Sequence, residues 1–272
     1  MDTERAEGVV LRKQSVTESS LIVTWYTREF GKLKTMAKGA RRPKGPFQGK
    51  IDLFYRDEIV FLPSKRSDLH LLHDCFLEQS HKRLRESVES LAAASYVCEL
   101  VELATEAEDP NAKLFDVLSM TLDALEIDRG RVAVVLWYEL QLLAAAGWKP
   151  TWEARTGATR VLDSLASTNL DGARRVRLTE SQASNSRQAI WQFIDAHLGR
   201  APRSRKLLAE TLGSKAHALT PVVALHLIQV VALHLLQVTV LHLLQVTALL
   251  IQEASQDLSN CPLAVFLERS FS

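Results

Sequence analysis

The chain has 272 residues, of which 47% are hydrophobic and 24% charged, with 33 Lys and Arg against 32 Asp and Glu. This composition is typical of a soluble globular protein and excludes a collagen, a coiled coil or a wholly disordered chain. Three distant cysteines, Cys75, Cys98 and Cys261, form no C-x-x-C pair, which excludes a disulfide framework and a four-thiolate zinc site. Residues 1–20 contain no apolar core of signal-peptide length, so we expect a cytoplasmic protein.

The charge is distributed unevenly along the chain. The formal net charge is +3 for residues 1–80, −5 for 81–150, +5 for 151–219 and −2 for 220–272. Two basic segments therefore flank an acidic one. A local basic excess favours a polyanionic partner even when the whole chain is nearly neutral.

Residues 1–80 have the pattern of a small β domain. Short alternating or β-branched runs occupy residues 7–13, 19–27, 32–38, 51–62 and 69–77. Five such strands are enough for a small barrel. Residues 28–31 predict a tight hairpin turn, whereas residues 39–49 are too long and too basic for one, and we interpret them as a functional loop.

Basic side chains are concentrated in and around this loop, between residues 31 and 51, where no acidic residue occurs. They are Lys32, Lys34, Lys38, Arg41, Arg42, Lys44 and Lys50. Most charge runs are solvated surface. A barrel of the oligonucleotide-binding type, however, offers a groove in which cations follow phosphates and aromatic rings stack on bases. We therefore predict that these residues bind nucleic acid and that Phe47, within the loop, stacks on a base.

From about residue 81 the apolar residues recur at helical spacing. The pattern predicts a helix that ends before residues 109–111, a second over residues 112–126 and a third over residues 131–146. The third is apolar almost all round, so we place it at the centre of a helical domain. Residues 151–177 are interpreted as a polar connection. Helical spacing returns at residues 188–198 and 204–212.

The segment 222–252 consists of four near-copies of one eight-residue unit, VVALHLIQ, VVALHLLQ, VTVLHLLQ and a shortened VTALLIQ. Eight residues turn an α-helix about 80° past two full turns, so the repeat maintains no fixed helix face and its three histidines diverge, which argues against a metal site. Histidines and glutamines interrupt the apolar run, so we do not expect a membrane span. A recent tandem expansion, a helix packed on the body and a poorly ordered tail remain open interpretations.

Motifs of catalysis are absent from the sequence. Residues 45–50, Gly-Pro-Phe-Gln-Gly-Lys, have too few residues between the glycines for a phosphate loop and are followed by Ile51, where Ser or Thr would hold Mg²⁺. No G-x-S-x-G, H-E-x-x-H or G-x-G-x-x-G motif occurs. We therefore expect neither an enzyme nor a cofactor.

Several sequence stretches carry a family resemblance. Residues 7–11 (Glu-Gly-Val-Val-Leu), 31–34 (Gly-Lys-Leu-Lys) and 37–44 (Ala-Lys-Gly-Ala-Arg-Arg-Pro-Lys) resemble the N-terminal domain of the bacterial DNA repair protein RecO family. Residues 137–150 and 203–208 are similar to its central and closing helices, so the resemblance covers about residues 5–213. It implies an α+β chain, with an oligonucleotide-binding barrel in residues 1–80 and a helical domain in 81–215, followed by an atypical tail, 216–272.

The family's properties define the expected function. They imply a non-catalytic recombination mediator that binds single- and double-stranded DNA, anneals complementary strands, acts with RecR and assists RecA loading, in association with the bacterial nucleoid. The acidic, aromatic-ended tail of the single-stranded DNA-binding protein is a further expected partner. A basic set could receive it: Arg200, Arg203, Arg205 and Lys206.

Two departures from the family pattern matter. Many members have a four-cysteine zinc module after the Gly-Trp-Lys-Pro stretch, but residues 151–177 contain no cysteine, so we predict no zinc. The repeat tail matches nothing typical of the family. The competing interpretation is a structural or membrane-peripheral adaptor in which residues 216–252 are the working part.

Overall fold

The computed structural model describes residues 2–128, 131–152 and 155–213. The chain divides into two units after Ser214. The predicted tail, its repeat and the adaptor function that would depend on it all lie outside the described residues. No helix within the described ranges is both long enough and apolar enough to cross a membrane.

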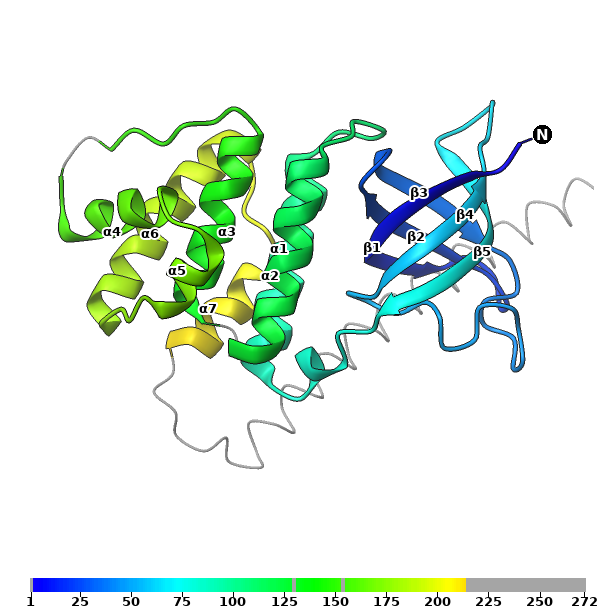
Figure 1. The fold of residues 1–272 in the computed structure, drawn as a ribbon, viewed down its shortest axis with the longest axis horizontal. Helices are drawn as coiled ribbons and strands as arrows, with labels where there is room; N and C mark the ends of the chain where they lie inside the picture. The colour runs from blue at the N-terminus through cyan, green and yellow to red at the C-terminus, as the bar shows by residue number, and fades with distance from the viewer. Residues whose placement is uncertain (1, 129–130, 153–154, 214–272) are drawn as a thin grey trace, which may run out of the picture. The chain divides into compact units, whose positions relative to one another are not determined.

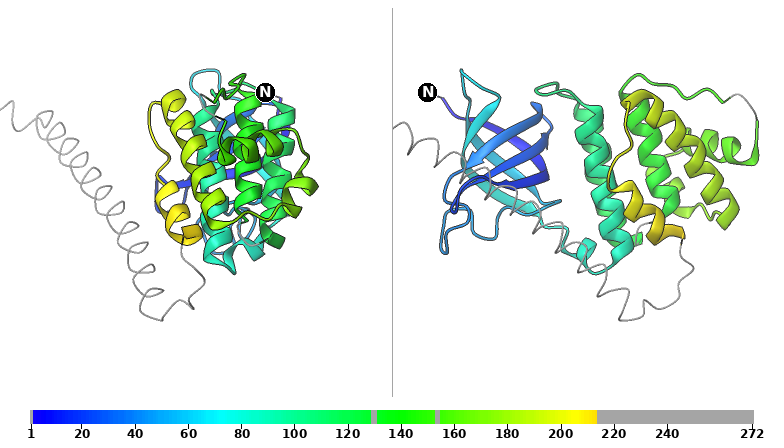
Figure 2. Two further views of the ribbon diagram at one scale, coloured as in Figure 1. Left: turned by 90° about the vertical axis from the view of Figure 1, so that its left-hand side faces the viewer. Right: turned by 180° about the vertical axis from the view of Figure 1, so that it is seen from behind.

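The N-terminal part is a closed five-stranded barrel, which confirms the predicted architecture (Figures 1 and 2). Its strands are β1 (Glu4–Ser15), β2 (Leu21–Thr27), β3 (Gly31–Ala37), β4 (Arg56–Leu62) and β5 (Leu69–Gln79). Around the barrel they follow the order β1-β2-β3-β5-β4. The long strand β1 pairs with both β2 and β4, and a parallel pairing of β3 with β5 closes the ring.

Strand alternation decides which side chains reach the surface of the barrel. In β3, Leu33, Thr35 and Ala37 are buried, while Lys32 and Lys34 lie on the outer face. The interior holds Trp25, whose indole N–H donates a hydrogen bond of 2.8 Å to Thr35 Oγ1. The barrel therefore buries its apolar residues and directs its lysines outward.

The remainder of the described chain is helical. After a short 3-10 helix, η1 (Lys82–Arg85), it contains α1 (Val88–Ala104), α2 (Ala112–Asp128), α3 (Val132–Ala145), α4 (Gly157–Ala166), α5 (Leu170–Arg175), α6 (Glu180–Leu198) and α7 (Arg205–Gly213). As predicted, α3 is central, because it packs against α1, α2, α4, α5 and α6. Its buried residues run from Ala133 to Leu140 without a break.

The prediction that residues 151–177 form only a polar connection was wrong. They contain α4 and α5, and α6 begins at Glu180 instead of near residue 188. Local side-chain caps start these helices: Thr156 before α4, Asn169 before α5 and Thr179 before α6 each accept a hydrogen bond from a backbone N–H of the first turn.

Candidate nucleic-acid interface

The basic loop, residues 38–49, follows β3 at the end of the barrel (Figure 1). Successive backbone turns shape it: the amide of Arg42 donates to the carbonyl of Gly39 (3.0 Å), and that of Gly45 donates to the carbonyl of Arg42 (2.9 Å). A Cβ at position 45 would lie 2.5 Å from the carbonyl oxygen of Gly39, so this close approach requires glycine. The loop is therefore compact and has a defined shape.

Two contacts attach the loop to the turn between β1 and β2. The amide of Arg41 donates to the carbonyl of Ser19 at 3.0 Å, and its guanidinium donates to the carbonyl of Thr17 at 3.1 Å. Both acceptors are neutral backbone oxygens, so the charge of Arg41 is not neutralised by these contacts.

Phe47 attaches the loop to the barrel core, and its position contradicts the prediction that it stacks on a base. Its side chain is 4% exposed and belongs to the barrel core with Trp25 and Tyr55. The ring is therefore not free to stack on a base. Burying this large apolar side chain stabilises the loop on the barrel, which explains the aromatic residue in an otherwise polar segment.

Four cations of the loop are exposed and form no ion pair with a carboxylate of the described chain. They are Lys38, Arg41, Arg42 and Lys44. The fold brings these predicted residues together on one compact segment. Exposed cations of this kind can bind phosphate oxygens without first breaking an ion pair.

The other three predicted lysines are already engaged. Lys34 pairs with Asp68 at 2.8 Å and Lys50 with Asp74 at 3.1 Å, although both side chains keep solvent access. Lys32 differs, because its ammonium donates to the carbonyls of Glu102 and Thr105 at the end of α1, and desolvation lowers its pKa. We therefore leave Lys32 out of the interface.

The four predicted partner-binding residues also differ in exposure. Arg200, Arg203 and Lys206 are exposed, but the side chain of Arg205 is only 10% exposed. Its Nη1 donates to both carboxylate oxygens of Asp195 (2.6 and 2.7 Å), and its guanidinium lies 5.0 Å from the ring centroid of Trp191. This burial contradicts a surface role for Arg205, which instead packs α7 against α6.

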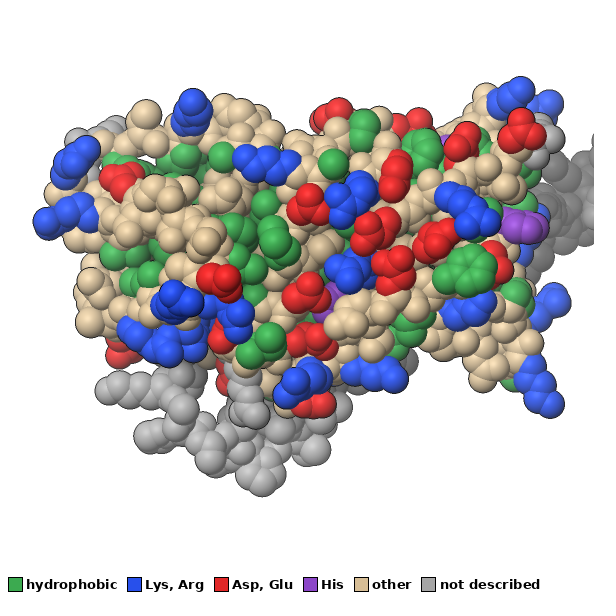
Figure 3. All heavy atoms as spheres, viewed as in Figure 1, with side chains coloured by type: hydrophobic (Ala, Val, Ile, Leu, Met, Phe, Trp, Pro, Cys, Tyr) green, Lys and Arg blue, Asp and Glu red, His purple; other side chains and the backbone are tan. Residues whose placement is uncertain are grey.

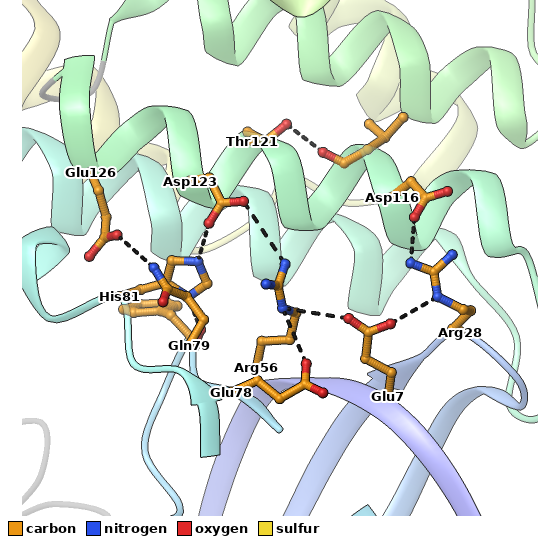
Figure 4. Close-up of polar contacts among 12 residues, drawn as sticks. Glu7, Arg28, Arg56, Glu78, Gln79, His81, Asp116, Thr121, Asp123 and Glu126 are labelled. Carbon is orange, nitrogen blue, oxygen red and sulfur yellow. Dashed lines mark hydrogen bonds and ion pairs between the residues drawn. The ribbon is translucent and has the colours of Figure 1, made fainter. Parts of the chain in front are cut away.

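A polar network joins the barrel to α2, and sequence reasoning missed it (Figure 4). Arg28, in the turn just after β2, donates to Glu7 at 3.0 Å and to Asp116 of α2 at 2.6 Å. Arg56 of β4 lies 3.5 Å from Glu7 and 3.9 Å from Asp123 of α2. Figure 3 shows basic and acidic side chains intermixed over this face. The partners are too distant in sequence for local spacing to reveal them.

His81 lies in the short chain segment that connects the barrel to the helical part, and its side chain is buried between them. Its exposed fraction is 1%, its Nδ1 lies 2.7 Å from the carbonyl oxygen of Phe54, and its Nε2 lies 2.9 Å from Asp123 Oδ1. Its φ of 42° is in the left-handed region, which is uncommon for a residue with a Cβ. The residue thus bridges a barrel loop and a helix at the point where the chain changes direction.

A second set of contacts joins β3 to the segment between α1 and α2. Besides the lysine contacts above, the amide of Glu108 donates to the carbonyl of Lys32 at 2.9 Å. A Cβ on Gly31 would lie 2.1 Å from the carbonyl oxygen of Asp109, so glycine is required there. The strand that leads into the basic loop is therefore held by the helical part.

Comparison with known proteins adds a family assignment. Residues 1–81 match the family profile described as Recombination protein O N terminal, and residues 85–159 match Recombination protein O C terminal. Similar curated proteins are named DNA repair protein RecO. The one from Rhodopirellula baltica is 36% identical over 152 residues, which is 55% of both chains. The one from Salinibacter ruber is 37% identical over 147 residues, or 54% of this chain and 56% of the relative. The match spans about half the length of these curated relatives.

Proposed function

The chain belongs to the recombination protein O family, and from this membership we propose that it is a non-catalytic recombination mediator in DNA repair that holds DNA on its basic loop. The observation that carries the proposal is the group of four exposed cations without acidic partners: Lys38, Arg41, Arg42 and Lys44. Lys34 and Lys50 flank this group and supply further charge once their surface ion pairs exchange with phosphates.

Annealing requires no bond chemistry, so the proposed mechanism is electrostatic. Two complementary strands repel each other through their phosphates, and a cationic surface reduces this repulsion while the base edges stay free to pair. The loop contributes charge but no available aromatic ring, since Phe47 is buried. We therefore expect backbone contacts without sequence preference, on both single- and double-stranded DNA.

The proposed partners follow from the family. They are RecR, RecA as the protein loaded onto the strand, and the acidic tail of the single-stranded DNA-binding protein. Of the predicted set, Arg200, Arg203 and Lys206 are exposed and can receive carboxylates of such a tail, whereas Arg205 cannot.

The first test measures fluorescence anisotropy of a labelled single strand across a salt series. We compare the wild type with the triple variant Arg41→Ala, Arg42→Ala, Lys44→Ala. Each lost phosphate contact lowers the log–log salt slope by about 0.7 on single strands, so the slope should fall by about 2.

The matched control removes three exposed cations elsewhere, by Lys82→Ala, Arg83→Ala, Lys113→Ala. The control should keep the wild-type slope, because the slope depends on the phosphates that the loop contacts and not on the net charge of the protein. Equal slopes in all three proteins would refute the assignment of the loop.

A further inference from the structure

The segment that connects α1 to α2 lies along an open edge of the barrel. Strand β3 pairs with β5 only through residues 34–36, so on that side its first residues have no partner among the five strands. Residues 105–109, Thr-Glu-Ala-Glu-Asp, take this place. Ala107 forms a parallel β-bridge with Lys32, and the amide of Glu108 donates to the carbonyl of Lys32 at 2.9 Å. We call these five residues the acidic strap, which extends the sheet by one short backbone contact.

The strap and the end of α1 also engage two cations of the barrel. The ammonium of Lys32 donates to the carbonyls of Glu102 and Thr105. The carboxylates of Glu102 and Glu106 interact favourably with the charge of Lys32. Arg12 of β1 pairs with Glu102 at 3.2 Å. In the free protein these two cations are therefore bound by an acidic segment of the same chain.

A cleft of about 350 Å³ lies between the barrel and this segment. The barrel wall, from β1, β2 and β3, contributes the cations Arg12, Lys32 and Lys34. The opposite wall contributes the carboxylates Glu102, Glu106 and Glu108, together with Arg200. In barrels of the oligonucleotide-binding type, the face of the second and third strands binds oligonucleotides. Carboxylates therefore line the side of this groove on which phosphates would lie.

Two properties allow the strap to move. Residues 106–109 are exposed and bury no side chain in either hydrophobic core, and segments with few buried apolar contacts open at low cost. Glu108 has a φ of 56°, in the left-handed region, which is strained for a residue with a Cβ. Its carboxylate lies 3.2 Å from Nε2 of His70, a contact that helps to hold this conformation. Displacing the strap releases the strain and offsets part of the contacts that are lost.

We propose that the acidic strap is an intramolecular competitor of DNA, which covers the groove of the barrel in the free protein and is displaced when a bound strand extends from the basic loop along β3. The proposal rests on the proposed function of the loop. Because β3 leads directly into the loop, a strand that passes Lys34 reaches Lys32 on the same face and Arg12 across the cleft. Its phosphates replace the carboxylates at these cations, so the groove binds phosphates only when DNA displaces the strap.

Hydrogen exchange of the full chain, measured by NMR with and without a single strand, tests the displacement. In the saturated complex the amide of Glu108, which donates to Lys32 in the free protein, should exchange about tenfold faster. Amides of the basic loop should exchange more slowly, because DNA covers them. Amides of α3 should stay protected in both states, which shows that the fold persists. Unchanged or slower exchange at Glu108 would overturn the proposal.

A variant without the carboxylates provides the second test. In Glu102→Gln, Glu106→Gln, Glu108→Gln the groove cations have lost these competitors, so a single strand should gain phosphate contacts at Arg12 and Lys32. Two added contacts steepen the log–log salt slope by about 1.4, at about 0.7 for each contact. Adding Arg12→Gln to this variant should remove about half of the gain.

The matched control neutralises three exposed carboxylates of the helical part, by Glu86→Gln, Glu180→Gln, Glu210→Gln. It changes the net charge by the same amount and should keep the wild-type slope. An equal steepening in the control, or none in the strap variant, would overturn the proposal. If the wild type binds no single strand at low salt, the proposed function fails as well, and anisotropy detects this independently of both strap experiments.

Discussion

At the residue scale, Asp57 of β4 is the most unusual side chain of the barrel. It is 0% exposed, and neither carboxylate oxygen has a hydrogen-bond partner among the described residues. Burial, reinforced by the negative charge of Glu78, raises the pKa of Asp57 from 3.8 to about 8, against the opposing charge of Lys50. At neutral pH the folded barrel therefore keeps a proton on this carboxyl group.

This protonation predicts that stability falls as the pH rises. Between about pH 4 and pH 8 the folded state binds a proton that the unfolded state has released, so the free energy of unfolding decreases across this window, by an amount on the order of several kcal/mol. Asp57→Asn keeps the shape and never ionises, so its stability should depend less on pH and exceed that of the wild type at pH 8.

Thermal unfolding between pH 5.5 and 8.5 checks this expectation. The control is Glu58→Gln, which changes the neighbouring, partly exposed carboxylate on the outer face of the same strand. Parallel pH profiles for wild type and Asp57→Asn would show that Asp57 is ionised in the folded protein.

At the element scale, α7 is held by a carboxylate from another helix. Glu99 of α1 accepts hydrogen bonds from the backbone amides of Arg203 (2.9 Å) and Ser204 (2.8 Å) and from the Ser204 hydroxyl. These donors precede the first turn of α7, where a negative charge also interacts favourably with the helix dipole.

Replacing Glu99 by Gln should therefore destabilise the docking of α7 by about 1–2 kcal/mol. Hydrogen exchange of the α7 amides should become roughly tenfold faster, since about 1.4 kcal/mol corresponds to a factor of ten, while α3 stays protected. Glu106→Gln, an exposed carboxylate just after α1, serves as the control. Unchanged exchange in α7 would mean that apolar packing alone, including the buried Leu208, holds this helix.

The same scale shows how far sequence reasoning extends. Strand alternation and helical periodicity predicted the barrel, α2 and α3, because these elements bury a regular pattern of apolar residues, whereas the basic loop was predicted from its length and its charge. The start of α6 was missed because its first turns bury little, and α5 because its six residues are too few to show a period. The burial of Phe47 and Arg205 was missed for another reason, since it depends on partners contributed by distant elements.

At the scale of the whole molecule, the question is how the barrel stays attached to the helical part. Both ring nitrogens of His81 face hydrogen-bond acceptors, the carbonyl of Phe54 and the carboxylate of Asp123. A carbonyl only accepts, and the bond from His81 lowers the pKa of Asp123, which is therefore ionised at neutral pH. His81 thus contacts an acceptor of a barrel loop with one ring nitrogen and an acceptor of α2 with the other, and so ties the two parts together.

The surroundings of His81 are densely charged. Asp123 and Glu126 of α2 and Glu78 of β5 are acidic groups of the same network, and Arg56 of β4 lies 3.9 Å from the second oxygen of Asp123. The lowered pKa of Asp123 also predicts how the stability changes at low pH. The stabilisation from its ionised form is present at neutral pH and is lost as the pH falls through the folded-state pKa of Asp123.

Acid unfolding tests how much the Asp123 carboxylate contributes to this junction. As the pH falls from 7 to 3, the wild type should lose more of its free energy of unfolding than Asp123→Asn, because the variant has no ionised carboxylate to protonate. Glu126→Gln, which removes a neighbouring carboxylate on the same helix without removing a contact of His81, is the control. Equal losses in the wild type and in Asp123→Asn would show that the ionised form of Asp123 adds no stability, and that the network of Arg28 and Arg56 joins the two parts without it.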